Sequence, residues 1–159
     1  MNEQELKRLV ELFGGTVYRA AYCYVKNSAD ADDIMQDAFL ALYTCGKSFS
    51  GDEHIKAWLI RVAVNRSKNL LRSSHRRLSV PLELAEDIPH EDGHTDSLLP
   101  QVMKLKPKYR IVLYMFYYED MSVRRIAEVL GESASAVTTR LSRARTQLKK
   151  LLLEEGYNE

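Results

Sequence analysis

The chain has 159 residues, of which 45% are hydrophobic and 28% charged, and its formal net charge is +1. This composition is typical of a soluble globular protein, and the length suits one ordinary domain or two small ones. No apolar run of about 18 residues and no signal peptide is recognisable, so we expect a cytoplasmic protein without membrane insertion. The only cysteines, Cys23 and Cys45, are far apart in the sequence and are expected to be reduced thiols.

The charge is distributed unevenly along the chain. Residues 1–78 carry 12 Lys/Arg and 9 Asp/Glu, residues 79–100 carry 6 Asp/Glu and no Lys/Arg, and residues 101–159 carry 11 Lys/Arg and 7 Asp/Glu. The acidic block also holds three of the four prolines. It lacks sustained helical periodicity, which predicts a flexible acidic linker. The two net-basic blocks suggest separate surfaces that bind polyanions.

A possible metal motif lies in this acidic block. His90 to His94 read HEDGH, which fits the H-E-x-x-H pattern of zinc-binding helices. Pro89 and Gly93 disfavour a regular helix there, and no apolar inner face would hold the two histidines. The metalloprotease interpretation is therefore disfavoured, and we expect no metal site and no cofactor. Bound zinc that is lost on His90→Ala would revive it.

The first basic block begins with two predicted helices. Periodicity predicts the first from residue 3 to about 26, with an inner face of Leu6, Leu9, Val10, Phe13, Val17, Ala21 and Tyr24. Asp30 fits as N-cap of the second, whose inner side carries Ile34, Met35, Ala38, Phe39 and Leu42. The opposite side carries Asp33, Gln36, Asp37 and Leu40. A Leu among acids suits a partner-binding face, although a solvated face with one incidental Leu fits the composition equally.

A loop from Thr44 to His54 precedes a third helix, which begins near Ile55 and has no acid before Glu83. Its predicted buried side is Leu59, Ile60, Ala63, Val64, Leu70 and Leu71. The other side carries a basic stripe, Arg61, Asn65, Lys68 and Arg72, with Trp58 at its N-terminal end. Basic side chains along one face match a phosphate backbone. A nearby loop and an aromatic suit single-stranded nucleic acid, while a core position for Trp58 is equally open.

The second basic block predicts a helix-turn-helix. Pro107 can start a helix through Tyr118, and Ser122 fits as N-cap of a short helix that ends at Gly131. Ile126, Ala127 and Leu130 are expected to pack inward, as are Val137, Leu141, Ala144, Leu148 and Leu151 or Leu152 of the following helix. Its outward positions are Ser135, Ala136, Thr138, Thr139, Ser142 and Arg143. Arg140, Arg143 and Arg145 can hold phosphates or a guanine edge. The alternative is an ordinary helical hairpin with a basic face.

Three motifs in this order resemble the extracytoplasmic-function (ECF) group of bacterial RNA polymerase sigma factors. ADDIMQDAFLALY is similar to the group's A-E-D-x-x-Q-x-x-F helix, and WLIRVAVNRSKNLLR to W-L-x-x-I-A-x-N-x-x-x-D-x-x-R. LGESASAVTTRLSRAR is similar to L-G-x-S-x-G-T-V-x-S-R-L-x-R-A-R. The resemblance covers nearly the whole chain. It implies an all-α protein with two small helical domains, sigma2 in residues 1–78 and sigma4 in residues 101–159, joined by the linker 79–100.

The resemblance also implies the partners and the residues that contact them. Core polymerase would be bound through its β′ clamp, by Asp33, Gln36, Asp37 and Leu40, and through its β flap. The −10 promoter element would be recognised and opened by Ser48, Phe49, Lys56, Trp58, Arg61, Asn65, Lys68 and Arg72. The −35 element would be read by Ser135, Ala136, Thr138, Thr139, Arg140, Ser142 and Arg143. An anti-sigma factor, which can hold such a protein at the membrane, is a further expected partner, and no catalytic residues are expected.

The chain departs from the family pattern at several positions. Asn69 stands where Asp is usual, Arg125 where many members have Glu, and Lys106 where proline is usual. Ser135, Ala136 and Thr138 replace a common Gly-Thr-Lys run. These last changes lie on the expected DNA-reading surface, so the −35 sequence cannot be inferred. A repressor-like regulator that acts without polymerase is the alternative, and it predicts a dimerisation face and a palindromic operator.

Overall fold

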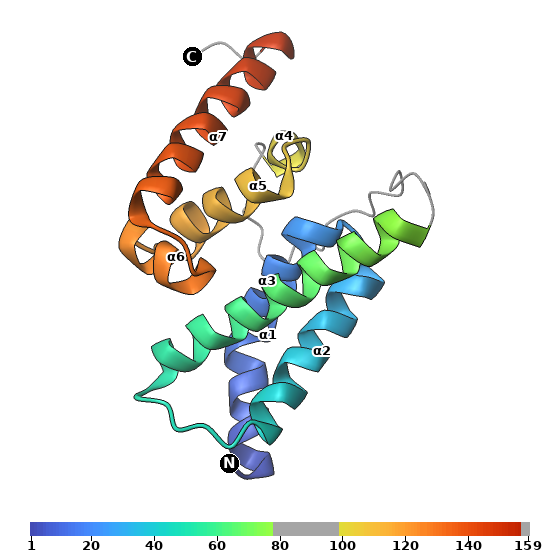
Figure 1. Ribbon diagram of the computed structural model, residues 1–159, viewed down its shortest axis with the longest axis vertical. Helices are drawn as coiled ribbons and strands as arrows, with labels where there is room; N and C mark the ends of the chain where they lie inside the picture. Colours follow the sequence, from blue (N-terminus) through green and yellow to red (C-terminus); the bar gives the residue numbers. More distant parts are fainter. Residues whose placement is uncertain (78–98, 157–159) are drawn as a thin grey trace. The chain divides into compact units, whose positions relative to one another are not determined.

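The computed structural model describes residues 1–77 and 99–156, which form seven α-helices and one π-helix and contain no strand. The chain divides into two compact units, and the division falls in the segment between the two described ranges (Figure 1). The expected all-α fold with two small helical units is therefore confirmed. The HEDGH motif and nearly all of the predicted linker lie outside the described residues.

The first unit is a bundle of three long helices (Figure 1). These are α1 (Glu3–Val25), α2 (Ser28–Thr44) and α3 (Asp52–Arg77), and each contacts the other two. All three contribute to one core, whose fully buried side chains include Leu9, Val17, Ala38, Leu59 and Ile60. Because each helix is apolar on one side only, the bundle leaves an outer side of α2 and of α3 exposed.

Two helix starts in this unit differ from the sequence prediction. The N-cap of α2 is Asn27 and not Asp30, since the Asn27 side chain accepts a hydrogen bond of 2.9 Å from the Asp30 backbone N–H. Helix α3 begins at Asp52, three residues before the predicted start at Ile55. Acidic residues in a first turn are favoured by the helix dipole, which explains the earlier start. The connecting loop is therefore residues 45–51.

The predicted inner faces are largely correct, but several residues differ. Val10 was expected to be buried and is 38% exposed, and Leu6, Met35, Leu70 and Leu71 are only half-buried. Ser67 was not expected in the core and is fully buried. Its hydroxyl donates a 2.7 Å hydrogen bond to the Ala63 carbonyl, which satisfies the polar group inside the bundle.

The second unit is built around its last helix. It comprises α4 (Leu99–Val102), α5 (Pro107–Leu113), the π-helix η1 (Tyr114–Tyr118), α6 (Val123–Leu130) and α7 (Ala134–Glu154). Helix α7 contacts α4, α5 and α6. The core includes Ile111, Met115, Ile126, Val137 and Leu141. A short helix, a left-handed Gly131 with φ 68° and a second helix form the expected helix-turn-helix.

Several local predictions in this unit can be compared with the structure. The cap at Ser122 is confirmed, because its hydroxyl accepts a 3.1 Å hydrogen bond from the Arg125 backbone N–H. The helix predicted from Pro107 to Tyr118 has the expected extent, but its last five residues are a π-helix. In α6 the buried residue near the end is Val129, while Leu130 is half-buried. Leu99 and Pro100, assigned to the linker, belong to α4.

Candidate polymerase and nucleic-acid interfaces

The outer side of α2 presents an acidic face with one apolar residue. Ala31, Ile34, Ala38, Phe39 and Leu42 are buried against the bundle, so the positions between them point outward. Asp33, Gln36 and Asp37 are exposed, and Leu40 is 60% exposed. The Gln36 side-chain amide donates a 2.7 Å hydrogen bond to Asp32. The four residues predicted to bind a partner therefore share one accessible face.

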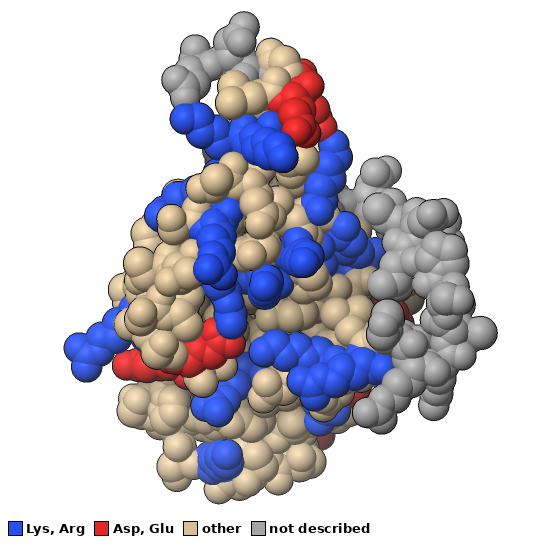
Figure 2. All heavy atoms as spheres, turned by 45° about the horizontal axis from the view of Figure 1, so that its top comes forward, with Lys and Arg blue, Asp and Glu red and all other residues tan. Residues whose placement is uncertain are grey.

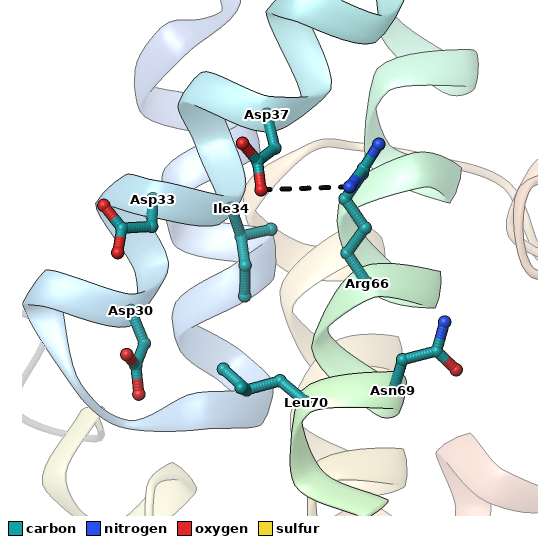
Figure 3. Close-up of a pocket in the computed structure, with 7 residues that line it drawn as sticks. All are labelled: Asp30, Asp33, Ile34, Asp37, Arg66, Asn69 and Leu70. Atoms are coloured by element: carbon teal, nitrogen blue, oxygen red, sulfur yellow. Dashed lines mark ion pairs between the residues drawn. The ribbon is translucent and has the colours of Figure 1, made fainter. Parts of the chain in front are cut away.

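This face continues into a groove between α2 and α3, of about 460 Å³ (Figure 3). The lining residues are Asp30, Asp33, Ile34, Asp37, Arg66, Asn69 and Leu70. Asp37 and Arg66 point toward each other across the groove, with 3.8 Å between carboxylate and guanidinium (Figure 3). Both side chains are exposed, so this pair adds little stability. Sequence reasoning did not assign Arg66 or Asn69 to this site, because their place opposite α2 depends on how the helices cross.

The outer side of α3 carries the basic stripe as predicted. Arg61, Asn65 and Arg72 are exposed and Lys68 is half-buried. In the described ranges, Arg61 and Lys68 form no ion pair, and the Arg72 guanidinium makes only a long 3.5 Å hydrogen bond to the Asn69 side chain. Figure 2 shows blue Lys and Arg side chains on much of the described surface that is turned to the viewer, with few red Asp and Glu side chains among them. Cations without acidic partners are available to neutralise phosphates.

An aromatic cluster lies where the 45–51 loop meets the start of α3. The Phe49 ring contacts Trp58 edge-on, with 5.7 Å between ring centroids and an interplanar angle of 70°. Lys47 Nζ lies 5.8 Å from the centroid of the Trp58 ring. Trp58 and Lys56 are half-buried, whereas Ser48 is exposed. Trp58 is therefore neither a fully buried core residue nor a fully exposed one. Its ring contacts the loop at Lys47 and Phe49.

The front of α7 exposes most of the predicted DNA-reading residues. Ser133 caps the helix by accepting a 3.1 Å hydrogen bond from the Ala136 backbone N–H. Exposed positions in the first turns are Ser135, Thr138, Thr139, Ser142 and Arg143. Ala136 is half-buried, and Val137 and Leu141 hold the opposite side in the core. Small polar residues beside the exposed Arg143 form a surface that can approach base edges in a major groove.

Two other arginines of α7 are engaged within the protein. Arg140 Nη2 donates a 2.9 Å hydrogen bond to Glu132, the residue after the turn glycine, and their side chains are 26% and 23% exposed. Arg145 Nε donates a 2.7 Å hydrogen bond to the Tyr117 hydroxyl, and its guanidinium stacks 5.2 Å from the Phe116 ring centroid. These contacts to residues outside α7 are not visible in helical periodicity, which places both arginines only on a basic face.

The structure also bears on metal binding and on membrane insertion. Within residues 1–77 and 99–156, no group of three or more His, Cys, Asp or Glu side chains is arranged to hold a metal ion. No helix in these ranges is both long and apolar enough to span a bilayer.

Comparison with known families gives the same two-part organisation. The sigma-70 region 2 family matches residues 9–77, and the sigma-70 region 4 family matches residues 96–148. The RNA polymerase sigma factor SigV of Bacillus subtilis is 30% identical over 144 residues, which cover 89% of this chain and 87% of SigV. The ECF RNA polymerase sigma factor SigW of the same organism is 26% identical and covers 91% of this chain and 87% of SigW.

A solved structure extends this similarity to three dimensions. The structure of CnrH in complex with the cytosolic domain of CnrY matches with a TM-score of 0.71 and 30% identity, covering 98% of this chain and 92% of that one. The chain belongs to the ECF group of the sigma-70 family. It is an RNA polymerase sigma factor that directs promoter-specific transcription.

Proposed function

We propose that the two units divide the work of a sigma factor between three surfaces. The first unit acts as the sigma2 domain, which binds core polymerase and opens the −10 element. The second acts as the sigma4 domain, which reads the −35 element. The observation that carries the proposal is that one small bundle exposes an acidic face with Leu40 on α2 and an acid-free basic face on α3.

The polymerase-binding surface is the α2 face, with Asp33, Gln36, Asp37 and Leu40 against the β′ clamp. Leu40 supplies apolar area that leaves water on binding, and the acids supply charge complementarity to a basic partner. A repressor that acts alone needs a dimerisation face, and an acidic face is poorly suited to pairing with its own copy because like charges repel. Its exposure therefore favours the polymerase-dependent interpretation over the stand-alone regulator.

The −10 surface combines the basic stripe of α3 with the aromatic cluster. Arg61, Lys68 and Arg72 would follow the phosphate backbone, with Lys56 beside them, and Asn65 would contact the strand through its amide. Ser48, Phe49 and Trp58 would receive an unpaired base, because aromatic rings stack on any base once it leaves the duplex. Binding energy gained on the open strand offsets the cost of unstacking the duplex.

The −35 surface is the front of α7. Arg143, beside Thr139 and Ser142, is the exposed arginine there and would contact phosphate or a guanine edge. Ser135, Ala136 and Thr138 lie at the end of the helix that enters the groove first. We assign Arg140 an indirect role, since its guanidinium is held by Glu132 and orients the helix-turn-helix.

The remaining assignments follow from this role. The protein itself catalyses no reaction, because the chemistry of RNA synthesis belongs to the polymerase, and it acts in the cytoplasm, where core polymerase and promoter DNA are found. We further propose an anti-sigma partner and a contact between the sigma4 domain and the β flap. The complex of CnrH with a domain of CnrY supports a partner of this kind.

Run-off transcription with bacterial core polymerase, with and without the protein, tests the proposal on a pool of promoter fragments from its host. Protein-dependent transcripts that share −10 and −35 elements are the expected result. Duplex binding without core binding and without transcripts would favour the stand-alone regulator.

A further inference from the structure

His54 lies in the first turns of α3, and its imidazole meets the loop that precedes the helix. Its Nδ1 accepts a 3.1 Å hydrogen bond from the Ser50 backbone N–H, and the Ser50 hydroxyl lies 3.3 Å from the same nitrogen. The His54 ring also contacts Phe49, with 5.1 Å between ring centroids and an interplanar angle of 73°. One side chain therefore holds two successive residues of the loop.

The same loop residue bridges two aromatic side chains of α3. Phe49 sits edge-on against both His54 and Trp58, which are four residues apart and thus lie on one side of the helix. Lys47 Nζ lies over the Trp58 ring from the loop side. The position of Phe49 relative to Trp58 is consequently set in part by His54.

The hydrogen bond fixes the protonation of the imidazole. A backbone N–H can only donate, so Nδ1 must carry a lone pair and the ring proton sits on Nε2. A protonated imidazole carries hydrogen on both nitrogens and would present an N–H to the Ser50 N–H. The contact therefore requires neutral His54.

We propose that neutral His54 is a positioning residue for the 45–51 loop. It holds the loop through the Ser50 backbone N–H, so that Phe49 stays in contact with Trp58. This inference rests on the proposed role of Phe49 and Trp58 in receiving an unpaired base. His54 acts through these residues and not through a DNA contact of its own. Asp52 and Glu53 precede it in the first turn of α3, and Asp52 pairs with Arg8 of α1.

Trp58 is the only tryptophan of the chain, so its fluorescence reports on this contact in the free protein. We would measure acrylamide quenching of Trp58 in the full chain for wild type, His54→Leu, His54→Asn and Phe49→Ala. Phe49→Ala gives the degree of quenching when Trp58 has lost its contact with Phe49. In His54→Leu the quenching should shift toward that degree, because Leu has no acceptor for the Ser50 N–H. His54→Asn should stay near wild type, since the Asn Oδ1 can take the place of Nδ1.

The pair of His54 variants separates hydrogen bonding from the filling of space. Asn is smaller than His and has no ring, but it keeps an acceptor in reach of the Ser50 N–H, whereas Leu fills space and has no acceptor. A wild-type degree of quenching in His54→Leu, or quenching in His54→Asn as high as in His54→Leu, would overturn the proposal.

The functional arm uses core polymerase and permanganate reactivity of the open −10 strand. His54→Leu should reduce opening roughly fivefold, the size of one net hydrogen bond, and leave core binding unchanged. Opening by His54→Leu equal to that by wild type would also overturn the proposed role in DNA opening. Wild type could fail to support transcription while His54→Leu still increases the quenching of Trp58. The proposed role of the loop in a sigma factor would then be wrong, but the contact between His54 and the loop would be supported.

Discussion

Arg140 and Glu132 form an ion pair across the turn of the helix-turn-helix, with Nη1 2.6 Å from Oε2 and Nη2 donating to Oε1 at 2.9 Å. Oε2 is buried, so the guanidinium at 2.6 Å supplies the positive charge that balances it. The pair connects the residue after Gly131 to the second turn of α7. It therefore fixes the angle at which α7 leaves the turn.

Arg140→Ala should destabilise the second unit by about 1–3 kcal/mol, because it leaves a largely buried carboxylate without its partner. Urea unfolding followed by circular dichroism measures this. Trp58 fluorescence, which reports only the first unit, should be unchanged and serves as the control. Arg140→Ala with Glu132→Ala should recover part of the loss. Unchanged unfolding together with weaker −35 binding would instead assign Arg140 to the DNA surface.

Leu40→Ala should weaken binding to core polymerase by roughly tenfold, since a buried Leu side chain contributes about 1.5–3 kcal/mol and part of it is retained as Ala. Leu12→Ala is the matched control, because Leu12 is 53% exposed on α1 of the same bundle and lies outside the proposed surface. Binding can be measured by fluorescence anisotropy of labelled protein with core. Equal losses from both substitutions would show that the α2 face is not the polymerase contact.

The helices themselves were predictable because the sequence repeats its apolar residues with a helical period. The outer faces of α2 and of α7 followed from the same periodicity, which is why Leu40 and Arg143 were placed correctly on exposed sides of their helices. Helix starts were less certain, because Asn27 and Asp30 are both good caps and only the end of α1 decides between them. In the structure Lys26 adopts a left-handed conformation with φ 51°, which ends α1 and leaves Asn27 as the cap.

Contacts between elements were the part that periodicity could not supply. Glu132 is separated from Arg140 by a turn, and Asp37 is far from Arg66 in the sequence, so neither pair follows from a helical wheel. The spacing of His54 and Trp58, four residues apart, was visible in the sequence. Its significance depends on the loop that folds back onto both rings, and that required the structure.

Arg143→Ala should weaken binding to a −35 duplex about five- to fiftyfold. If Arg143 contacts a phosphate, the slope of log affinity against log salt concentration should also fall by about one. Lys150→Ala removes the same charge from an exposed position nearer the end of α7 and should have a much smaller effect. Titration of fluorescent duplex at several salt concentrations distinguishes the two. Losses of the same size would indicate nonspecific attraction by the basic helix and not a contact of Arg143.

Asn65→Ala should impair strand opening at the −10 element and leave duplex binding at −35 unchanged, because Asn65 lies on the outer side of α3 in the other unit. Permanganate footprinting measures opening, and the −35 titration of the same variant is its internal control. Wild-type promoter activity in Asn65→Ala would mean that the basic face of α3 was assigned wrongly.

The first unit should lose stability in acid through an ion pair between α1 and α3. Arg8 donates hydrogen bonds of 3.0 and 2.9 Å to Asp52 and also pairs with Glu5. These hydrogen bonds from Arg8 lower the pKa of Asp52 and of Glu5. A carboxyl with a lowered pKa stabilises the fold above its unfolded pKa, and this stabilisation disappears as the pH falls through its folded pKa.

Arg8→Met should therefore lower the urea midpoint of the Trp58 transition at pH 7 and flatten its decrease between about pH 5 and pH 3. The effect at pH 7 should be small, because all three side chains are exposed and screened by water. Lys7→Met, which removes a neighbouring exposed charge, should keep the wild-type acid slope. An acid slope in Arg8→Met as steep as in wild type would show that other carboxyls govern the acid sensitivity of the bundle.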